Sequence, residues 1–169
     1  IKKGGVAVDF TMGNGHDTAW LSKAVGENGK VYAFDIQEKA LESTRNTLKS
    51  ENCPDNCTLI CDSHSNVLNY VHEKICVGVF NLGYLPGSGN KALTTLRPTT
   101  KMAVEAAISL LDTDSIILIA VYPGHEEGRL EGEMLDEKLS ALPQKQYSVS
   151  CLRIVNAPDC PFFYLIEKN

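Results

Sequence analysis

Three apolar stretches of the sequence each lead into an aspartate, and these carboxylates are the residues best suited to bind a ligand. Asp9 lies near the end of the first stretch, Asp35 ends Lys30–Asp35, and Asp62 directly follows Cys57–Cys61. In a parallel sheet the carboxyl ends of the strands share one edge, where ligands bind in open α/β folds. We therefore expect the three side chains to lie together at a binding site.

A glycine turn follows the first stretch. The run Val6–Phe10 leads through Gly13 and Gly15 into a helical pattern, so flexible backbone and the exposed amides of a helix start would face a ligand. The dinucleotide fingerprint G-x-G-x-x-G would need a third glycine where this chain has Thr18, which disfavours NAD. Asp9 also repels phosphates, so this turn suits a cationic or hydrogen-bond-donating ligand.

Two loops at the same expected edge carry further candidates. Asn81 opens a loop that contains Tyr84 and Pro86, and Tyr122 opens a loop that contains His125. His125 is placed to reach a substrate in the cleft, and it equally fits a residue that begins the next helix. The polar, Thr-rich stretch between the two loops carries the basic residues best placed to contact an anionic substrate, which are Lys91, Arg97 and Lys101.

The elements that must position these residues follow from the hydrophobic pattern. Apolar or alternating runs predict strands at Val6–Phe10, Lys30–Asp35, Cys57–Cys61, Ile75–Phe80, Ser115–Val121, Gln146–Val155 and Phe162–Glu167. Helical periodicity predicts helices from Asp17 or Thr18 to Val25, and at Gln37–Glu51, Asn66–Lys74, Met102–Leu111 and about Leu130–Ala141. This order predicts an α/β fold with a mostly parallel seven-stranded sheet, flanking helices and antiparallel C-terminal strands. Residues 1–169 are expected to form one domain.

The composition excludes several classes of protein. With 169 residues and a formal net charge of −5, the chain is not a general nucleic-acid binder, although a local basic patch could still bind one RNA. No apolar run is long enough to span a membrane, and no signal peptide is visible. The six cysteines include no CxxC pair, so no metal is expected and a cytoplasmic location is favoured. Since the first strand begins almost at once, we expect a short N-terminal segment to be missing.

With this element order and these acidic strand ends, the whole chain resembles the class I, Rossmann-like methyltransferases, which use S-adenosylmethionine. The segment from Asp9 to Gly15 is similar to the first motif of that family. The resemblance implies that Asp9 lies near the methionine amine, Asp35 binds the ribose, and Ile36 contacts the adenine. The implied cofactor-binding residues are Asp9, Thr11, Gly13, Asn14, Gly15, Asp17, Thr18, Asp35, Ile36, Asp62, Ser63, Asn81 and Leu82.

Three segments resemble one group within that family, the rRNA methylases. They are Asp9–Thr18, the Asn-Leu-Gly-Tyr-Leu-Pro-Gly segment from Asn81, and the Tyr-Pro-Gly-His segment that ends at His125. Phe10 stands where the pattern of this group usually has Ala, and we expect the cofactor loop to accommodate it. Members of the group methylate the 5-aminomethyl group of the tRNA wobble uridine to give 5-methylaminomethyl-2-thiouridine. The resemblance implies the same RNA methylation here, at the tRNA anticodon.

The resemblance also implies roles in methyl transfer for Asn81, Tyr84 and His125. Asn81 would accept a hydrogen bond from the amine, Tyr84 would stack on the flipped base, and His125 would take the proton or orient the substrate. The expected substrate contacts come from Tyr84, Pro86, Lys91, Arg97, Tyr122 and His125.

Other functions are compatible with the same sequence. An rRNA base methyltransferase or a small-molecule N- or O-methyltransferase would use the same cofactor, and the acidic net charge favours the small molecule. A module that binds the cofactor without catalysis is a third alternative, against which the loop at Asn81 counts. Because a single small domain that acts on tRNA often needs a second subunit, a homodimer is also expected.

Overall fold

The computed structural model describes residues 1–83, 95–157 and 159–169. The strands in these ranges are β1 Val6–Asp9, β2 Lys30–Asp35, β3 Cys57–Cys61, β4 Ile75–Asn81, β5 Leu111–Val121, β6 Tyr147–Leu152 and β7 Phe162–Lys168. The helices are α1 His16–Val25, α2 Glu38–Ser50, the 3-10 helix η1 His64–Asn69, α3 Arg97–Leu110 and α4 Glu126–Ser140. Among the described residues, no helix is both long and apolar enough to cross a membrane.

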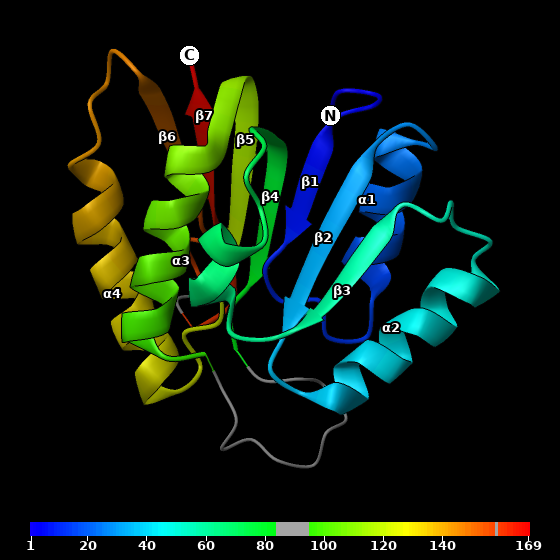
Figure 1. Ribbon diagram of the computed structural model, residues 1–169. Helices are drawn as coiled ribbons and strands as arrows, with labels where there is room; N and C mark the ends of the chain where they lie inside the picture. Colours follow the sequence, from blue (N-terminus) through cyan, green and yellow to red (C-terminus); the bar gives the residue numbers. More distant parts are fainter. Residues whose placement is uncertain (84–94, 158) are drawn as a thin grey trace.

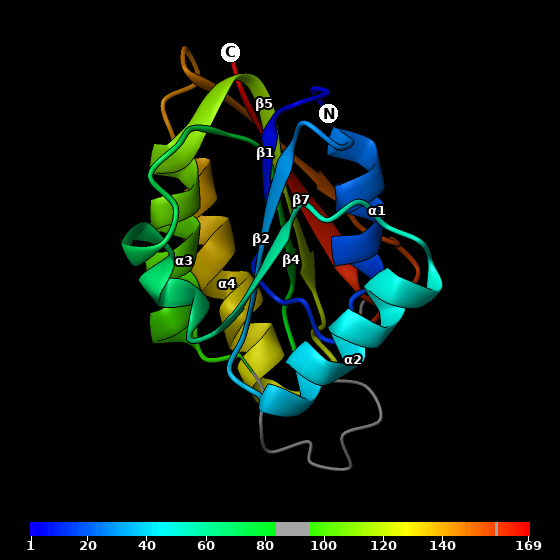
Figure 2. The ribbon, with the colours of Figure 1, turned by 45° about the vertical axis from the view of Figure 1, so that its right-hand side comes forward.

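The described strands form one seven-stranded sheet in the order β3-β2-β1-β4-β5-β7-β6. The first five strands in this order are parallel to one another, whereas β7 is antiparallel to both β5 and β6. Helices α1 and α2 cover one face of the sheet, and α3 and α4 cover the other (Figures 1 and 2). Both ends of the chain lie at one edge of the sheet, and the parallel strands end at the opposite edge (Figure 1). The predicted α/β architecture is confirmed.

Helix α3 and the segment after β3 differ from the prediction. Helix α3 begins at Arg97 rather than Met102. Pro98 is compatible with this start because the first turn of a helix leaves its N–H groups without partners inside the helix, so the N–H that proline lacks is not needed there. The helix expected at Asn66–Lys74 is instead the 3-10 turn η1, which ends at Asn69. Only two residues of η1 are buried, so it offers too little apolar face to sustain a longer helix.

Helix α4 also begins earlier than expected, at Glu126 rather than Leu130. His125 is its N-cap, and the imidazole Nδ1 accepts a hydrogen bond from the backbone N–H of Gly128 at 3.0 Å. Gly128 lies so close to the end of β5 that a Cβ atom there would stand 2.0 Å from the carbonyl oxygen of Tyr122. A glycine in the first turn therefore fixes how closely α4 approaches the sheet.

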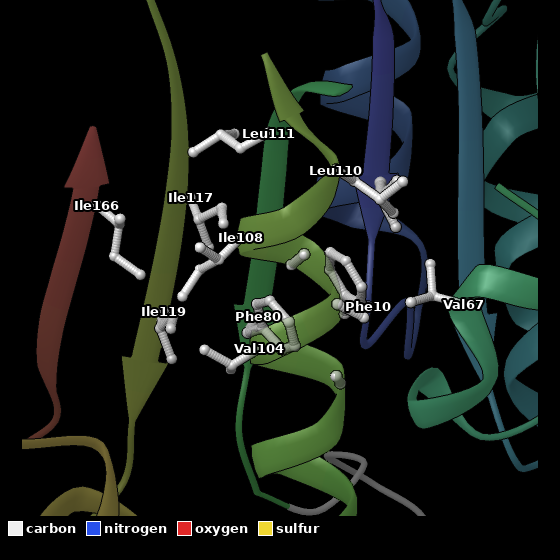
Figure 3. Close-up of a cluster of buried hydrophobic side chains, with 14 of the residues drawn as sticks. Phe10, Val67, Phe80, Val104, Ile108, Leu110, Leu111, Ile117, Ile119 and Ile166 are labelled. Carbon is white, nitrogen blue, oxygen red and sulfur yellow. The ribbon is translucent and has the colours of Figure 1, made fainter. Parts of the chain in front are cut away.

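The larger hydrophobic core lies between the sheet and α3 (Figure 3). Val104 and Ile108 of α3 pack on a layer of strand residues that includes Phe80, Ile117 and Ile119, and all five are buried. Each such side chain stabilises the fold by roughly 1.5–3 kcal/mol. A second core, on the α1 face, consists of Ala7, Leu21, Val25, Val31, Cys76, Val77 and Val79. A third, smaller cluster consists of Met12, Ala33 and Leu41.

Phe10, the residue that departs from the usual pattern of the resembling group, is part of the larger core. Its ring stacks on that of Phe80 with a centroid separation of 4.0 Å, and the residue is 1% exposed (Figure 3). Such a pair adds about 0.5–1.5 kcal/mol beyond its buried area. The turn after β1 therefore accommodates the larger side chain by burying it between the strands and α3.

We predict that Gly128→Ala destabilises the protein, because the new methyl group would overlap the backbone of Tyr122. The expected loss in the free energy of unfolding is about 1–3 kcal/mol or more, measured by urea denaturation. Gly124→Ala is the matched control, since nothing lies within 4 Å of a Cβ atom there, and its expected effect is within about 0.5 kcal/mol. Equal stability of the two variants would contradict the close approach of α4.

Candidate functional site

A pocket of about 670 Å³ lies at the edge of the sheet where the parallel strands end. It is bounded by the segments that follow β1, β2, β3, β4 and β5 and by the start of α3. Its wall consists of Phe10, Thr11, Met12, Gly13, Asn14, His16, Asp17, Phe34, Asp35, Ile36, Gln37, Asp62, Ser63, His64, Asn81, Leu82, Gly83, Thr95, Leu96, Thr99 and Tyr122. The sequence-predicted residues Thr11, Gly13, Asn14, Asp17, Asp35, Ile36, Asp62, Ser63, Asn81, Leu82 and Tyr122 are in this wall.

The carboxylate of Asp35 joins the ends of β1 and β2. Its Oδ2 accepts a hydrogen bond from the backbone N–H of Gly13 at 3.2 Å, and its Oδ1 accepts one from Gln37 at 2.9 Å. Gly13 has a φ of 51°, a left-handed conformation that glycine adopts readily. Burial raises the pKa of Asp35 above its ordinary value. A carboxylate has further lone pairs, so Asp35 can also accept bonds from hydroxyl groups of a ligand.

Asp9, in contrast, is fully buried and is not in the pocket wall. Its Oδ2 accepts a hydrogen bond from the Thr18 hydroxyl at 2.6 Å, and its Oδ1 accepts one from the Thr11 N–H at 3.1 Å. Burial raises the pKa of Asp9 to about 7. This carboxylate is therefore enclosed by protein groups and ties the turn to α1. Its implied position near the cofactor amine stays a prediction.

Gly15 and Thr18 also lie outside the pocket wall. Gly15 has a φ of 84° and is the N-cap of α1, and a Cβ atom there would stand 2.7 Å from the backbone of Thr44 in α2. Thr18 is buried against Asp9. Both residues shape the turn and its packing. The sequence pattern alone does not distinguish such a structural role from contact with a ligand.

Asp62, after β3, is held in place by three donors. Its Oδ1 accepts from the Ser63 N–H at 2.7 Å and the Asn66 side chain at 3.0 Å, and its Oδ2 accepts from the Tyr70 hydroxyl at 2.9 Å. The hydrogen bonds from Asn66 and Tyr70 lower the pKa of Asp62. Asp62 is therefore a fixed anionic acceptor at the pocket.

The apolar part of the pocket wall, which we call the slot, includes a histidine that no sequence pattern singled out. Phe10, Phe34 and Ile36 line the slot beside His64. His64 is 9% exposed, and its Nδ1 lies 3.1 Å from the carbonyl oxygen of Phe10. Burial lowers the pKa of His64, which favours the neutral imidazole. No local motif marks His64, because its position depends on how η1 folds back on the sheet.

Asn81, at the end of β4, is bonded on two sides. Its backbone N–H donates to the Thr11 hydroxyl at 2.7 Å, and its side-chain Nδ2 donates to Asp17 Oδ2 at 2.5 Å. An ionised carboxylate only accepts hydrogen bonds, so Asp17 determines that the Nδ2 of the amide faces α1. The amide Oδ1 is then the group of Asn81 that can accept a hydrogen bond from a ligand.

The remaining predicted substrate residues have different positions. Arg97 and His125 are not in the pocket wall. Arg97 Nε pairs with Glu127 Oε1 at 3.0 Å, which engages the charge that was expected to bind an anion. His125 Nδ1 caps α4, so the imidazole is held by the helix rather than placed in the wall. Three other predicted residues, Tyr84, Pro86 and Lys91, lie outside the described residues.

The pocket combines an apolar slot with the carboxylates of Asp17, Asp35 and Asp62. A planar, mostly apolar ring fits the slot, hydroxyl groups fit the carboxylate acceptors, and a cationic group fits the negative field. The described side chains form no group of three or more His, Cys, Asp or Glu that could hold a metal ion. The carboxylates and the apolar slot together therefore suit a nucleoside that carries positive charge.

This pocket, at the edge of a sheet with strand order β3-β2-β1-β4-β5-β7-β6 and an antiparallel β7, defines a class I methyltransferase, whose cofactor is S-adenosylmethionine. Residues 31–168 match the model of a family described as "Putative rRNA methylase". The chain belongs to this family of S-adenosylmethionine-dependent methyltransferases.

Individual relatives agree with this membership. The chain is 36% identical to an Arabidopsis thaliana protein named tRNA (mnm(5)s(2)U34)-methyltransferase, chloroplastic, in an alignment that covers 100% of this chain and 65% of the relative. The crystal structure of a "putative rRNA-methylase" from Clostridium thermocellum has a TM-score of 0.95 and 41% identity, over 100% of this chain and 91% of that chain. A methyltransferase from Streptococcus mutans, crystallised with SAH, has a TM-score of 0.88 and 36% identity over the same shares. Because the chain spans only 65% of the Arabidopsis relative, the substrate and partners of the whole protein are proposals.

We predict that Asp9→Asn removes a pH dependence of stability. The pKa of Asp9 rises from 3.8 to about 7 on folding, so its proton stabilises the fold below pH 3.8, and this contribution is lost as the pH rises through about 7. Wild type should lose stability relative to Asp9→Asn over this range, by up to about 1.4 kcal/mol per pH unit.

The measurement is urea unfolding at constant ionic strength across the same pH range. The exposed Asp55→Asn is the control, and its difference from wild type should stay constant with pH. Parallel stability curves for wild type and Asp9→Asn would rule out the raised pKa.

Proposed function

We propose that this protein transfers a methyl group from S-adenosylmethionine to the nitrogen of the 5-aminomethyl group on the wobble uridine of tRNA. The observation that carries the proposal is the Asn81–Asp17 hydrogen bond at the end of β4. It leaves the amide oxygen of Asn81, a residue of the pocket wall, as the atom of this amide that can accept a hydrogen bond, which suits an acceptor that bears N–H groups.

The cofactor would lie along the ends of β1, β2 and β3. Asp35 would accept hydrogen bonds from the ribose hydroxyls, and Phe34 and Ile36 would pack on the adenine, which Asp62 and Ser63 border. Asp17 and Asp35 supply negative charge that favours a cationic ligand. S-adenosylmethionine, when bound, supplies a methyl group on a sulfonium centre that is open to nucleophilic attack.

The residues of the chain would orient the acceptor amine. The Oδ1 of Asn81 would accept a hydrogen bond from the neutral amine and so aim the nitrogen lone pair at the methyl group. On taking the methyl group that the cofactor would supply, the nitrogen would become cationic and would then lose a proton to water, and S-adenosylhomocysteine would be the leaving group. The negative field of Asp17, which is bonded to Asn81, favours this developing positive charge.

Exposed apolar groups at the rim support a nucleobase as the acceptor. Tyr122 is 43% exposed and Leu96 is 53% exposed, and both line the pocket. An aromatic ring at such a rim offers a surface on which an unstacked base can lie. We further propose that Tyr84 and Pro86 contact this base and that Lys91 contacts a flanking phosphate.

The named relatives support the same acceptor. The Arabidopsis thaliana relative is named for the modified uridine at tRNA position 34, and its alignment spans this whole chain. We therefore propose the tRNA anticodon region as partner, bound by a homodimer that covers more of the RNA than one 18.5 kDa chain can.

Two other acceptors have specific support. The family description names rRNA, which supports an rRNA base as acceptor. The net charge of −5 supports a small molecule, because an acidic chain attracts RNA poorly.

Methyl transfer from labelled S-adenosylmethionine distinguishes these acceptors. The purified protein would be incubated separately with rRNA, with a metabolite extract, and with tRNA that carries 5-aminomethyl-2-thiouridine. Label in that tRNA, located at position 34 by nucleoside mass spectrometry, is the expected result. Label only in rRNA or only in metabolites would replace the wobble-uridine proposal with the corresponding alternative.

We predict that Asn81→Ala lowers the turnover number for the tRNA acceptor about a hundredfold, because the amine loses its orienting acceptor. Affinity for S-adenosylhomocysteine, measured by calorimetry, should fall much less than turnover, because Asn81 is one of many predicted cofactor-binding residues and the proposed nucleoside contacts lie on other strands. Wild-type turnover with unchanged cofactor affinity would show that Asn81 does not orient the amine.

A further inference from the structure

Glu131 in α4 is a buried carboxylate with no role in the chemistry proposed above. The residue is 1% exposed, and in the described part of the chain it forms no salt bridge. Its Oε1 accepts a hydrogen bond from the Thr100 hydroxyl at 2.5 Å, and its Oε2 accepts one from the Thr95 hydroxyl at 2.9 Å. Burial raises its pKa. An apolar residue of similar volume would avoid the cost of desolvating this group, so stability alone does not explain it.

Thr95 connects Glu131 to the pocket. Thr95 lies in the pocket wall, and its backbone N–H donates to the carbonyl oxygen of Gly83 at 3.0 Å. Gly83 also lines the pocket, and it follows Asn81 and Leu82 at the end of β4. A continuous series of bonds thus links the carboxylate of α4 to the strand end that carries the proposed amine acceptor.

Thr100 provides the second connection, through the first turn of α3. Thr100 is fully buried, and its backbone N–H donates to the carbonyl oxygen of Leu96 at 2.9 Å. Leu96 and Thr99 line the pocket with Thr95. We call Thr95, Leu96 and Thr99 the acceptor wall. Because one carboxylate binds a hydroxyl on each side of Leu96, it restricts the whole wall relative to α4.

We propose that Glu131 is a positioning residue that holds the acceptor wall at a fixed distance from Asn81 and so determines how the methyl acceptor is held. This inference rests on the proposed function, in which the acceptor enters between this wall and Asn81. The proposed nucleoside contacts at Asp35 and Asp62 belong to other strands. Loss of the Glu131 bonds should therefore impair the acceptor and leave cofactor affinity intact.

Two substitutions of Glu131 separate its hydrogen bonds from its charge. Glu131→Gln keeps both bonds, because each threonine hydroxyl can either donate or accept. Glu131→Met has a similar volume and offers no comparable acceptor, so it releases Thr95 and Thr100 without opening a large cavity. The amide variant should behave as wild type, and the thioether variant should not.

Asp136 gives a matched control on the same helix. It accepts hydrogen bonds from Tyr164 of β7 and from Arg153, whose Nη2 lies 3.3 Å from Asp136 Oδ2. It is not part of the pocket wall. Asp136→Leu therefore weakens a side-chain contact of α4 without touching the acceptor wall.

The first measurement is methyl-transfer kinetics with tRNA that carries 5-aminomethyl-2-thiouridine, together with calorimetry of S-adenosylhomocysteine. Glu131→Met should lower kcat/KM for the tRNA on the order of tenfold to a hundredfold, with the dissociation constant of S-adenosylhomocysteine unchanged. Glu131→Gln and Asp136→Leu should retain wild-type kcat/KM. Equal losses in Glu131→Met and Asp136→Leu, or an unchanged kcat/KM in Glu131→Met, would overturn the proposal.

The second measurement, amide hydrogen exchange, does not depend on the identity of the acceptor. In Glu131→Met, exchange should accelerate at Thr95 and Thr100, whose N–H groups bond to Gly83 and Leu96. Wild-type exchange at both amides would overturn the positioning role. If wild-type protein methylates no RNA while exchange accelerates as expected, then the proposed function fails and the positioning role of Glu131 stands.

Discussion

The parallel register of β1 with its two neighbours is the constraint on which the site depends. Asp9 lies opposite Ala33 of β2 and Val79 of β4, and both neighbouring strands continue two residues further than β1, to Asp35 and Asn81. The chain continues to β2 and β3 on one side of β1 and to β4 and β5 on the other, and this reversal of order opens the crevice that forms the pocket. A slip of one residue would exchange the faces of every β1 side chain and separate Phe10 from its core.

The acidic residues near this edge form two groups, one that joins elements of the fold and one that faces the pocket. Asp9 and Glu131 are buried, form no salt bridge in the described ranges, and bind threonine hydroxyls that join one element to another. Asp17, Asp35 and Asp62 line the pocket, where their lone pairs and negative charge can interact with a ligand. Burial is what separates the groups, because a carboxylate enclosed by protein must be satisfied by protein donors. A nucleoside with a cationic centre suits the three carboxylates that line the pocket.

Most strands could be predicted closely because they are apolar or alternating runs bounded by turn residues, and the buried positions of a central parallel strand are hydrophobic in the sequence. Strand β5 begins at Leu111, four residues earlier than predicted, because polar residues follow Leu111 in the sequence. The starts of α3 and α4 could not be predicted from the sequence. Pro98 and the threonines around it are typical of a loop. Gly128 interrupts the helical pattern at the start of α4, although the same glycine allows α4 to approach β5 closely. Local composition cannot reveal a close contact with a distant backbone, so these helices were expected to begin later.

The sequence by itself determined the fold class, the edge of the sheet at which a ligand binds, and most of the pocket wall, because alternating apolar segments and polar strand ends encode them locally. The tertiary structure alone decided which polar residues face the pocket. In the folded chain Asp9 is buried against α1, His125 caps α4, and Arg97 pairs with Glu127. The tertiary structure also brought His64 into the slot. These outcomes depend on contacts between residues far apart in the chain, which residue spacing does not specify.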